Sequence, residues 1–251
     1  MGLNKPSGNM YPGFWTWNGI AGCLFNCTYC YLHDKRLNFD STPRLVEARF
    51  KDNLSKHGAI NIFVGSSGDA WGDNIPSEWI SRVLEYCKRF RQNTYLFQTK
   101  NPQRFRPFIN DLPTNTILAA TIETDWNGYS YSEAPSPRFR QVAFNEVRLR
   151  SEGHYKTMLS IEPIIWFTGQ FGAFLLEMDA DIYSIGADSQ HSGLKEPSPD
   201  CVAALIKELR QAKKEVRLKN NLKRLLKDKS QFIETMTEIK TDILPKQLRF
   251  L

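Results

Sequence analysis

Three of the chain's five cysteines, Cys23, Cys27 and Cys30, lie together in the segment "GCLFNCTYCYL". In a reducing compartment, an odd number of cysteines with tight local spacing indicates metal or redox chemistry rather than a disulfide framework. Three thiolates can ligate three irons of a cubane iron–sulfur cluster, which leaves the fourth iron without a protein ligand. The spacing therefore predicts a cluster with one open coordination position.

A second interpretation of the same segment stays open. His33 follows Cys30 after two intervening residues, so three thiols and one imidazole could form a Cys3His zinc site in a non-catalytic nucleic-acid-binding protein. Structural zinc sites usually take their ligands from two separated pairs, which this run lacks. The remaining thiols, Cys87 and Cys201, lie in segments with helical spacing and are interpreted as packed side chains.

Composition limits the class of protein. The chain has 251 residues, of which 41% are hydrophobic, enough to build a substantial core. No window approaches eighteen uncharged apolar residues, and the first ten residues lack the apolar segment of a signal peptide. We expect a single domain over residues 1–251, located in the cytoplasm and without a membrane partner. The sequence does not indicate an oligomeric state.

The net charge of +6 suits a polyanionic partner. The excess of Lys and Arg is concentrated in residues 207–229, "KELRQAKKEVRLKNNLKRLLKDK". A solvated helix face explains this run as well as nucleic-acid binding does. We expect a basic helical tail from about residue 220.

The elements that must position these residues follow a repeated pattern. Short, continuously apolar runs are each followed by a segment with helical spacing, which is typical of parallel strands buried on both faces. A further strand before the cysteines and a helix over about 43–56 give six βα units and one more strand. This is short of eight units, so we expect an α/β fold, a partial (β/α)6-type TIM barrel with parallel strands and outer helices. The expected strands from residue 60 onward are 60–65, 94–99, 116–123, 156–163, 181–186 and 215–220.

Ligands of parallel α/β folds gather at the carboxyl ends of the strands. Charged residues also follow apolar runs simply because loops are exposed to solvent. This explains part of the charged residues at the predicted strand ends. It explains Glu162 less well, because Glu162 lies between Ile161 and Pro163 and an ionised carboxylate in apolar company needs a partner. The candidate site residues at predicted strand ends are Gly65, Ser66, Ser67, Asp69, Glu123, Ser160, Glu162, Asp188 and Lys219.

The cysteine segment resembles the signature of the radical S-adenosylmethionine (SAM) superfamily, Cys-x3-Cys-x-aromatic-Cys, with Tyr29 at the aromatic position. The resemblance implies a [4Fe-4S] cluster held by Cys23, Cys27 and Cys30, with SAM chelating the open iron. It also implies that an external electron donor drives cleavage of SAM to a 5′-deoxyadenosyl radical, which takes a hydrogen atom from the substrate.

The same resemblance implies roles for other residues. The loop after the second strand, here Gly65 to Asp69, holds the methionine amino group of SAM in the superfamily. The ends of the fourth and fifth strands reach its ribose and carboxylate, which makes Glu123, Ser160 and Glu162 cofactor-binding candidates, and Tyr29 is expected on the adenine side. Asp188 and Lys219 are left as catalytic or substrate-binding candidates.

Two narrower likenesses concern the substrate. "CLFNCTYCYL" resembles the cluster loop of the spore photoproduct lyases, which repair DNA. A wider set, including "IFVGSSGDAWGDNIPSEWI", "TYLFQTKNPQRF" and "MLSIEPI", resembles a phage-associated radical SAM family, some members of which are linked to thymine hypermodification. Both imply a modified DNA base or nucleotide-like substrate and isomerase or lyase chemistry. A small metabolite or a peptide stays open as the alternative substrate.

Overall fold

The structure, a computed structural model, describes residues 2–6, 11–33, 40–128 and 130–226. Its main element is an eight-stranded sheet with the order β1-β2-β5-β6-β7-β8-β9-β10. A separate two-stranded sheet pairs β3 with β4. The strands are β1 (Leu3–Asn4), β2 (Phe14–Trp17), β3 (Ile20–Ala21), β4 (Arg44–Leu45), β5 (Asn61–Val64), β6 (Thr94–Thr99), β7 (Thr116–Thr121), β8 (Lys156–Ile161), β9 (Ile182–Ile185) and β10 (Glu215–Leu218).

The seven strands from β2 to β10 in this sheet pair in parallel, and only β1 is antiparallel to its neighbour β2. Because β1 and β10 end the strand order, the sheet is open rather than a closed barrel. Each predicted strand is present, with ends within a few residues of the prediction. The α/β class and the partial barrel are therefore confirmed.

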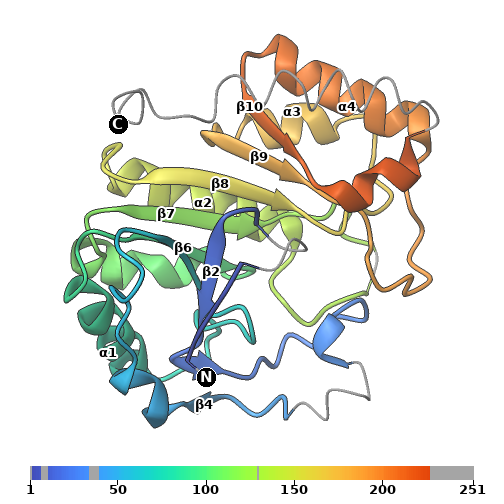
Figure 1. Cartoon of the computed structure of the whole chain (residues 1–251). Coiled ribbons are helices and arrows are strands. Elements are labelled where there is room, and N and C mark those ends of the chain that lie inside the picture. The colour runs from blue at the N-terminus through green and yellow to red at the C-terminus, as the bar shows by residue number, and fades with distance from the viewer. Residues whose placement is uncertain (1, 7–10, 34–39, 129, 227–251) are drawn as a thin grey trace.

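Helices connect successive strands and cover one side of the sheet, where Figure 1 shows α2 and α3 behind the strands. Two of them begin at a serine that caps the first turn: Ser136 accepts from the Phe139 amide and Ser198 from the Cys201 amide. The helices are α1 (Ser77–Lys88), α2 (Pro137–Arg150), α3 (Phe171–Leu176) and α4 (Pro199–Gln211), and the 3-10 segments are η1 (Tyr31–His33), η3 (Glu47–Lys51), η4 (Pro102–Asp111) and η5 (Asn220–Leu225).

The predicted helix over residues 43–56 is wrong. Strand β4 and the short 3-10 segment η3 occupy this stretch instead. The Val46 amide donates to the Gly19 carbonyl at 2.8 Å, and the Trp17 indole donates to the Arg49 carbonyl at 3.3 Å. These long-range bonds take backbone groups that an α-helix would use. The expected basic tail begins as the 3-10 segment η5, and its remainder, 227–251, lies outside the described residues.

Two faces of the sheet are packed differently. The outward side chains of the strands join the helices in two large hydrophobic clusters. A smaller cluster on the inner face includes Tyr11, Phe63, Leu96 and Met158, with Phe14 packed against it. None of the helices in the described residues is both long and apolar enough to cross a bilayer. Because the inner cluster is smaller than the two outer clusters, space remains on the concave side of the sheet.

Candidate functional site

The start of the cysteine segment is pinned to the loop that follows β5. The Gly22 amide donates to the Ser67 carbonyl at 3.0 Å, and Gly22 forms a parallel bridge with Gly68. A Cβ on Gly68 would lie 2.2 Å from the Gly22 carbonyl oxygen, and Gly22 itself has φ +92°. Only glycine allows this approach and this backbone conformation. The contact places the three cysteines at the carboxyl ends of the parallel strands.

Each cysteine sulfur has a hydrogen-bonding neighbour. The Phe25 amide donates to Cys23 Sγ at 3.4 Å, and the Leu32 amide donates to the Cys30 sulfur. Cys27 is 6% exposed, and its Sγ lies 3.2 Å from Ser132 Oγ in the loop between β7 and α2. Two of the three sulfurs therefore have a local amide partner, whereas the third has a side-chain partner from another loop.

The three thiols suit a cubane cluster, whose protein ligands do not converge on one ion. In the stretches that the structure describes, no three Cys, His, Asp or Glu side chains converge tightly enough to hold one metal ion. A cubane binds each thiolate at a separate iron, so its three sulfurs stand farther apart than the ligands of one ion. The charges of Cys27 and Cys30 both act on the pKa of Cys23, so the thiols share one neighbourhood.

Without a bound cation, burial holds the Cys23 and Cys30 thiols protonated. Burial raises the pKa of Cys23 to about 12, and the Asp69 charge adds to the effect. Burial also raises the pKa of Cys30, against the Leu32 amide, which lowers it. A metal ligand must be a thiolate, so cluster binding at this loop releases protons.

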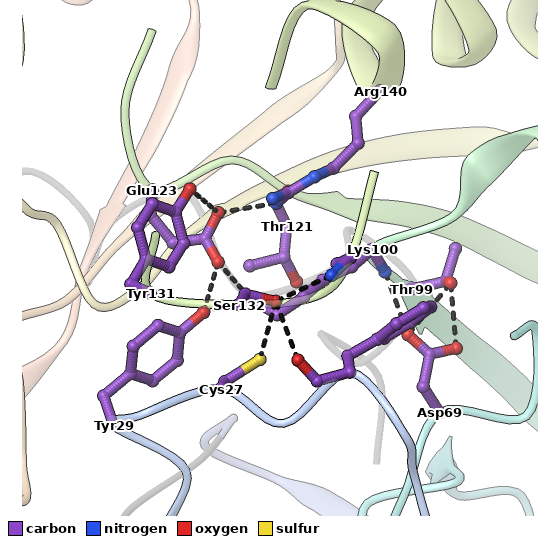
Figure 2. Close-up of polar contacts among 12 residues, drawn as sticks. Cys27, Tyr29, Asp69, Thr99, Lys100, Thr121, Glu123, Tyr131, Ser132 and Arg140 are labelled. Atoms are coloured by element: carbon purple, nitrogen blue, oxygen red, sulfur yellow. Dashed lines mark hydrogen bonds and ion pairs between the residues drawn. The ribbon is translucent and has the colours of Figure 1, made fainter. Parts of the chain in front are cut away.

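Glu123 is the centre of a buried polar cluster beside the cysteine loop (Figure 2). Its Oε2 accepts from Arg140 Nη1 at 2.6 Å, and its Oε1 pairs with the Lys100 ammonium and the Tyr29 hydroxyl. Burial alone would raise the pKa of Glu123, but the charges of Arg140 and Lys100 hold it well below its usual range. The carboxylate therefore stays ionised and ties the cysteine loop, through Tyr29, to the ends of β6 and β7.

Asp69 fastens the loop after β5 to the end of β6. It accepts from Thr99 Oγ1 at 2.8 Å, from the Lys100 amide at 2.9 Å and from the Trp71 amide at 3.0 Å. Burial raises the pKa of Asp69, and these hydrogen bonds oppose the shift. The carboxylate is engaged in supporting the loop, whereas Ser66 and Ser67 of the same loop line the cavity described below.

A second ion pair lies across the sheet from the cysteines. Glu162 pairs with the Lys219 ammonium and accepts from Asn221 Nδ2 at 2.8 Å. The Lys219 ammonium also lies 4.2 Å from the centre of the Tyr11 ring, and the Tyr11 hydroxyl donates to Ser160 Oγ at 3.0 Å. Burial lowers the pKa of Lys219, but the Tyr11 and Glu162 charges outweigh it and raise the pKa. Glu162 thus has the partner that its apolar sequence context required.

Asp188 organises the loop that follows β9. Its carboxylate accepts from the Gln190 amide at 2.8 Å, and from the amide and hydroxyl of Ser192, both at 2.6 Å. Burial would raise the pKa of Asp188, but these hydrogen bonds lower it on balance. Asp188 is 3% exposed, so its main contacts are within its own loop.

A cavity of about 1600 Å³ extends along the concave side of the sheet. Its lining reaches from the first residues of the strands, such as Thr94 and Lys156, to the residues beyond their carboxyl ends. Single ligand pockets measure roughly 300–1000 Å³, so this cavity is large enough for more than one small molecule. The predicted site residues that line it are Tyr29, Cys30, Ser66, Ser67, Glu162, Asp188 and Lys219.

The sequence prediction missed several side chains that hold the site together. Lys100 directly follows a strand, and the sequence marks it as a charged strand-end residue without indicating a role. Arg140 lies within α2 and Tyr11 in the segment before β2, and neither carries a local sequence signal. Missed residues with direct contacts to predicted ones include Tyr11, Tyr131, Ser132, Arg140 and Asn221.

The fold is shared with solved structures. A mutant of spore photoproduct lyase, with bound AdoMet and dinucleoside spore photoproduct, matches with a TM-score of 0.62 and 11% identity, over 86% of this chain and 78% of that one. The lyase complexed with dinucleoside spore photoproduct matches with a TM-score of 0.62 and 12% identity, over 86% of this chain and 78% of that one. Streptococcus suis SuiB bound to S-adenosylmethionine gives 0.55 and 13%, over 81% of this chain and 49% of that one.

These comparisons define the class of structure: an α/β protein with a partial TIM barrel like that of spore photoproduct lyase and SuiB. The chain belongs to DUF5131, a family of proteins of unknown function, whose model matches residues 14–165. The matched region runs from β2 through β8 and includes the cysteine loop and Glu123. No curated protein sequence matches the chain.

Proposed function

We propose that the chain is a radical SAM enzyme in which Cys23, Cys27 and Cys30 hold a [4Fe-4S] cluster. The observation that carries the proposal is the position of the cysteine loop. It lies at the carboxyl ends of the parallel strands, with Cys30 on the lining of the large cavity, where ligands of such folds bind. When bound, the cluster and SAM would supply one-electron cleavage of SAM to a 5′-deoxyadenosyl radical, driven by an external electron donor.

The chain's own residues divide into those that contact SAM and those that support them. Ser66 and Ser67 line the cavity beside Cys30 and are proposed to hold the methionyl end of SAM, at the turn made by Gly65. Asp69 is proposed to support that loop. Glu123 is fully buried and is proposed to fix Tyr29 rather than to contact SAM.

On the opposite wall, the proposed substrate side contains Glu162, Asp188 and Lys219. Ser160 is buried and acts through Tyr11.

The proposed substrate is a nucleotide-like molecule or a nucleic-acid base. Four cationic side chains line the cavity, namely Lys5, Lys156, Arg217 and Lys219, and cations of this kind suit phosphate groups. The dinucleoside spore photoproduct bound in the lyase structures supports the same class. Modification of a DNA base by isomerase or lyase chemistry, including the phage thymine case, is the finer version of this proposal.

Two measurements test the chemistry. After anaerobic reconstitution and reduction with dithionite, the protein should release 5′-deoxyadenosine from SAM. Changing Cys23, Cys27 or Cys30 to Ala should abolish the visible absorbance and the bound iron, whereas Cys201→Ala, a change at an exposed cysteine, should leave both intact. An intact cluster without any product from SAM would sink the proposal.

Metal and salt measurements separate the alternatives. One equivalent of zinc without iron or sulfide in anaerobically prepared protein would favour the zinc-stabilised protein. Binding to DNA that weakens steeply with salt would favour a nucleic-acid substrate over a small metabolite or peptide, because displaced counterions make such binding salt-dependent. Comparison of modified nucleosides in DNA with and without this protein tests the base-modification version directly.

A further inference from the structure

The partner of Cys27 differs in kind from the partners of the other two cluster cysteines. Cys23 and Cys30 each receive an amide from the residue two positions later, Phe25 and Leu32. These amides belong to the same short loop as the sulfurs, so both hydrogen bonds are local to the cysteine loop. Cys27 has a hydroxyl partner, Ser132, which is 105 residues away in sequence, and Figure 2 shows the two side chains facing each other.

Every hydrogen-bonding group around Ser132 can be accounted for with the Cys27 thiol present. The Cys27 thiol donates to Ser132 Oγ at 3.2 Å, and the Ala134 amide donates to the same oxygen at 3.1 Å. The single hydroxyl proton of Ser132 goes to the Phe25 carbonyl, 3.1 Å away. That carbonyl also accepts from the Glu133 amide at 2.7 Å.

The hydrogen bonds around Ser132 change when the Cys27 sulfur ligates a metal. A ligating sulfur carries no proton and becomes an acceptor only. The Ser132 hydroxyl can then turn its proton to the sulfur, because Ser132 Oγ still accepts from the Ala134 amide. The Phe25 carbonyl is not left unpaired, since it keeps the Glu133 amide. A rotation of one hydroxyl therefore satisfies the new charge without moving the backbone.

We propose that Ser132 donates a hydrogen bond to the Cys27 sulfur when the cluster is bound, and that it tunes the cluster's reduction potential. This inference rests on the proposed function. Hydrogen bonds to cluster sulfurs are one of the factors that set the potential. Reduction adds negative charge to the cluster, so a donor at the sulfur stabilises the reduced form and raises the potential. Ser132 is thus a positioning residue that acts through Cys27.

Redox titration of the reconstituted protein, followed by electron paramagnetic resonance, tests the proposal with three proteins. Wild type and Ser132→Thr, which keeps the hydroxyl, should share one midpoint potential. Ser132→Ala should titrate at a lower potential and reach a smaller reduced fraction at the same dithionite concentration. Iron content and the melting temperature of each protein should be measured in parallel, because they separate cluster loading from folding.

The outcomes distinguish this inference from the proposed function. Absence of any cluster in wild type would overturn both. A wild-type cluster with an equal potential in Ser132→Ala would overturn only the role of Ser132. An equal lowering in Ser132→Thr and Ser132→Ala would also overturn it, since loop displacement rather than loss of the hydroxyl would then be the cause. Glu133→Asp, which keeps the charge at an exposed position of the same loop where Glu133 accepts from Asn26, should titrate like wild type.

Discussion

Glu123 Oε2 lies 2.6 Å from Arg140 Nη1, and the two side chains are 0% and 1% exposed. The pair joins the end of β7 to α2 directly behind the cysteine loop. Arg140 Nη1 also donates to the Thr121 carbonyl at 2.8 Å. A buried ion pair that is bonded on both sides fixes these elements relative to one another, and the removal of either partner leaves an uncompensated charge.

Glu123→Ala should therefore lower the free energy of unfolding by about 3–5 kcal/mol, because Arg140 and Lys100 lose their buried counter-charge. Urea denaturation measures the change. Glu47→Ala is the matched control, since Glu47 forms a bidentate pair with Arg82 at the surface and exposed pairs contribute little. A loss for Glu123→Ala no larger than for Glu47→Ala would contradict the central role of the buried pair.

The same pair predicts a pH dependence. The pKa of Glu123 in the folded protein is well below its ordinary value of 4.5, so the unfolded state binds the proton first as the pH falls. The stabilisation is fully present above about pH 4.5 and is lost progressively below it. Glu123→Gln should flatten the acid side of a plot of unfolding free energy against pH. Some slope of the unfolding free energy against pH should remain in Glu123→Gln, because the pKa of Asp188 is also lowered. An unchanged acid limb in Glu123→Gln would count against this assignment.

Lys219 lies on the cavity lining but is already paired with Glu162. A ligand phosphate must compete with this carboxylate. Glu162→Gln should therefore tighten binding of a nucleoside monophosphate about tenfold, equivalent to about 1.4 kcal/mol, as measured by calorimetry.

Two controls accompany that measurement. Glu162→Gln combined with Lys219→Met should show no gain, because the freed ammonium is then missing. Glu196→Gln, which removes the carboxylate partner of Arg224 outside the cavity, should bind like wild type. Equal affinities for Glu162→Gln and wild type would argue that phosphate binds elsewhere.

The contact between Gly22 and Gly68 should tolerate no side chain. Gly68→Ala would place a Cβ 2.2 Å from a backbone oxygen, so the free energy of unfolding should fall by at least about 1–3 kcal/mol. The cysteine loop should shift with it, and iron loading should fall. Gly169→Ala is the control because a Cβ there meets nothing within 4 Å. Equal stability and iron content in both variants would show that the loops are not held by this contact.

The sequence by itself determined the strands and the grouping of the three cysteines in one short segment. Continuous apolar runs, such as Thr94–Thr99, can be buried only between two layers, so their order along the chain already implied a parallel sheet. Three cysteines within eight residues need no folding to be neighbours. The same local reasoning failed over residues 43–56, where long-range bonds of Gly19 and Trp17 override the helical pattern.

Only the tertiary structure decided what each candidate residue contacts. Glu123 and Asp69 look alike in sequence as acids near strand ends, yet one is paired with two buried cations and the other with hydroxyl and amide groups. Arg140, Tyr11 and Ser132 reach the site from distant segments, because their side chains are aimed by packing that no local pattern encodes. Contacts between residues far apart in the chain form only when the strands and helices pack together into the complete sheet. Local sequence patterns do not specify that packing.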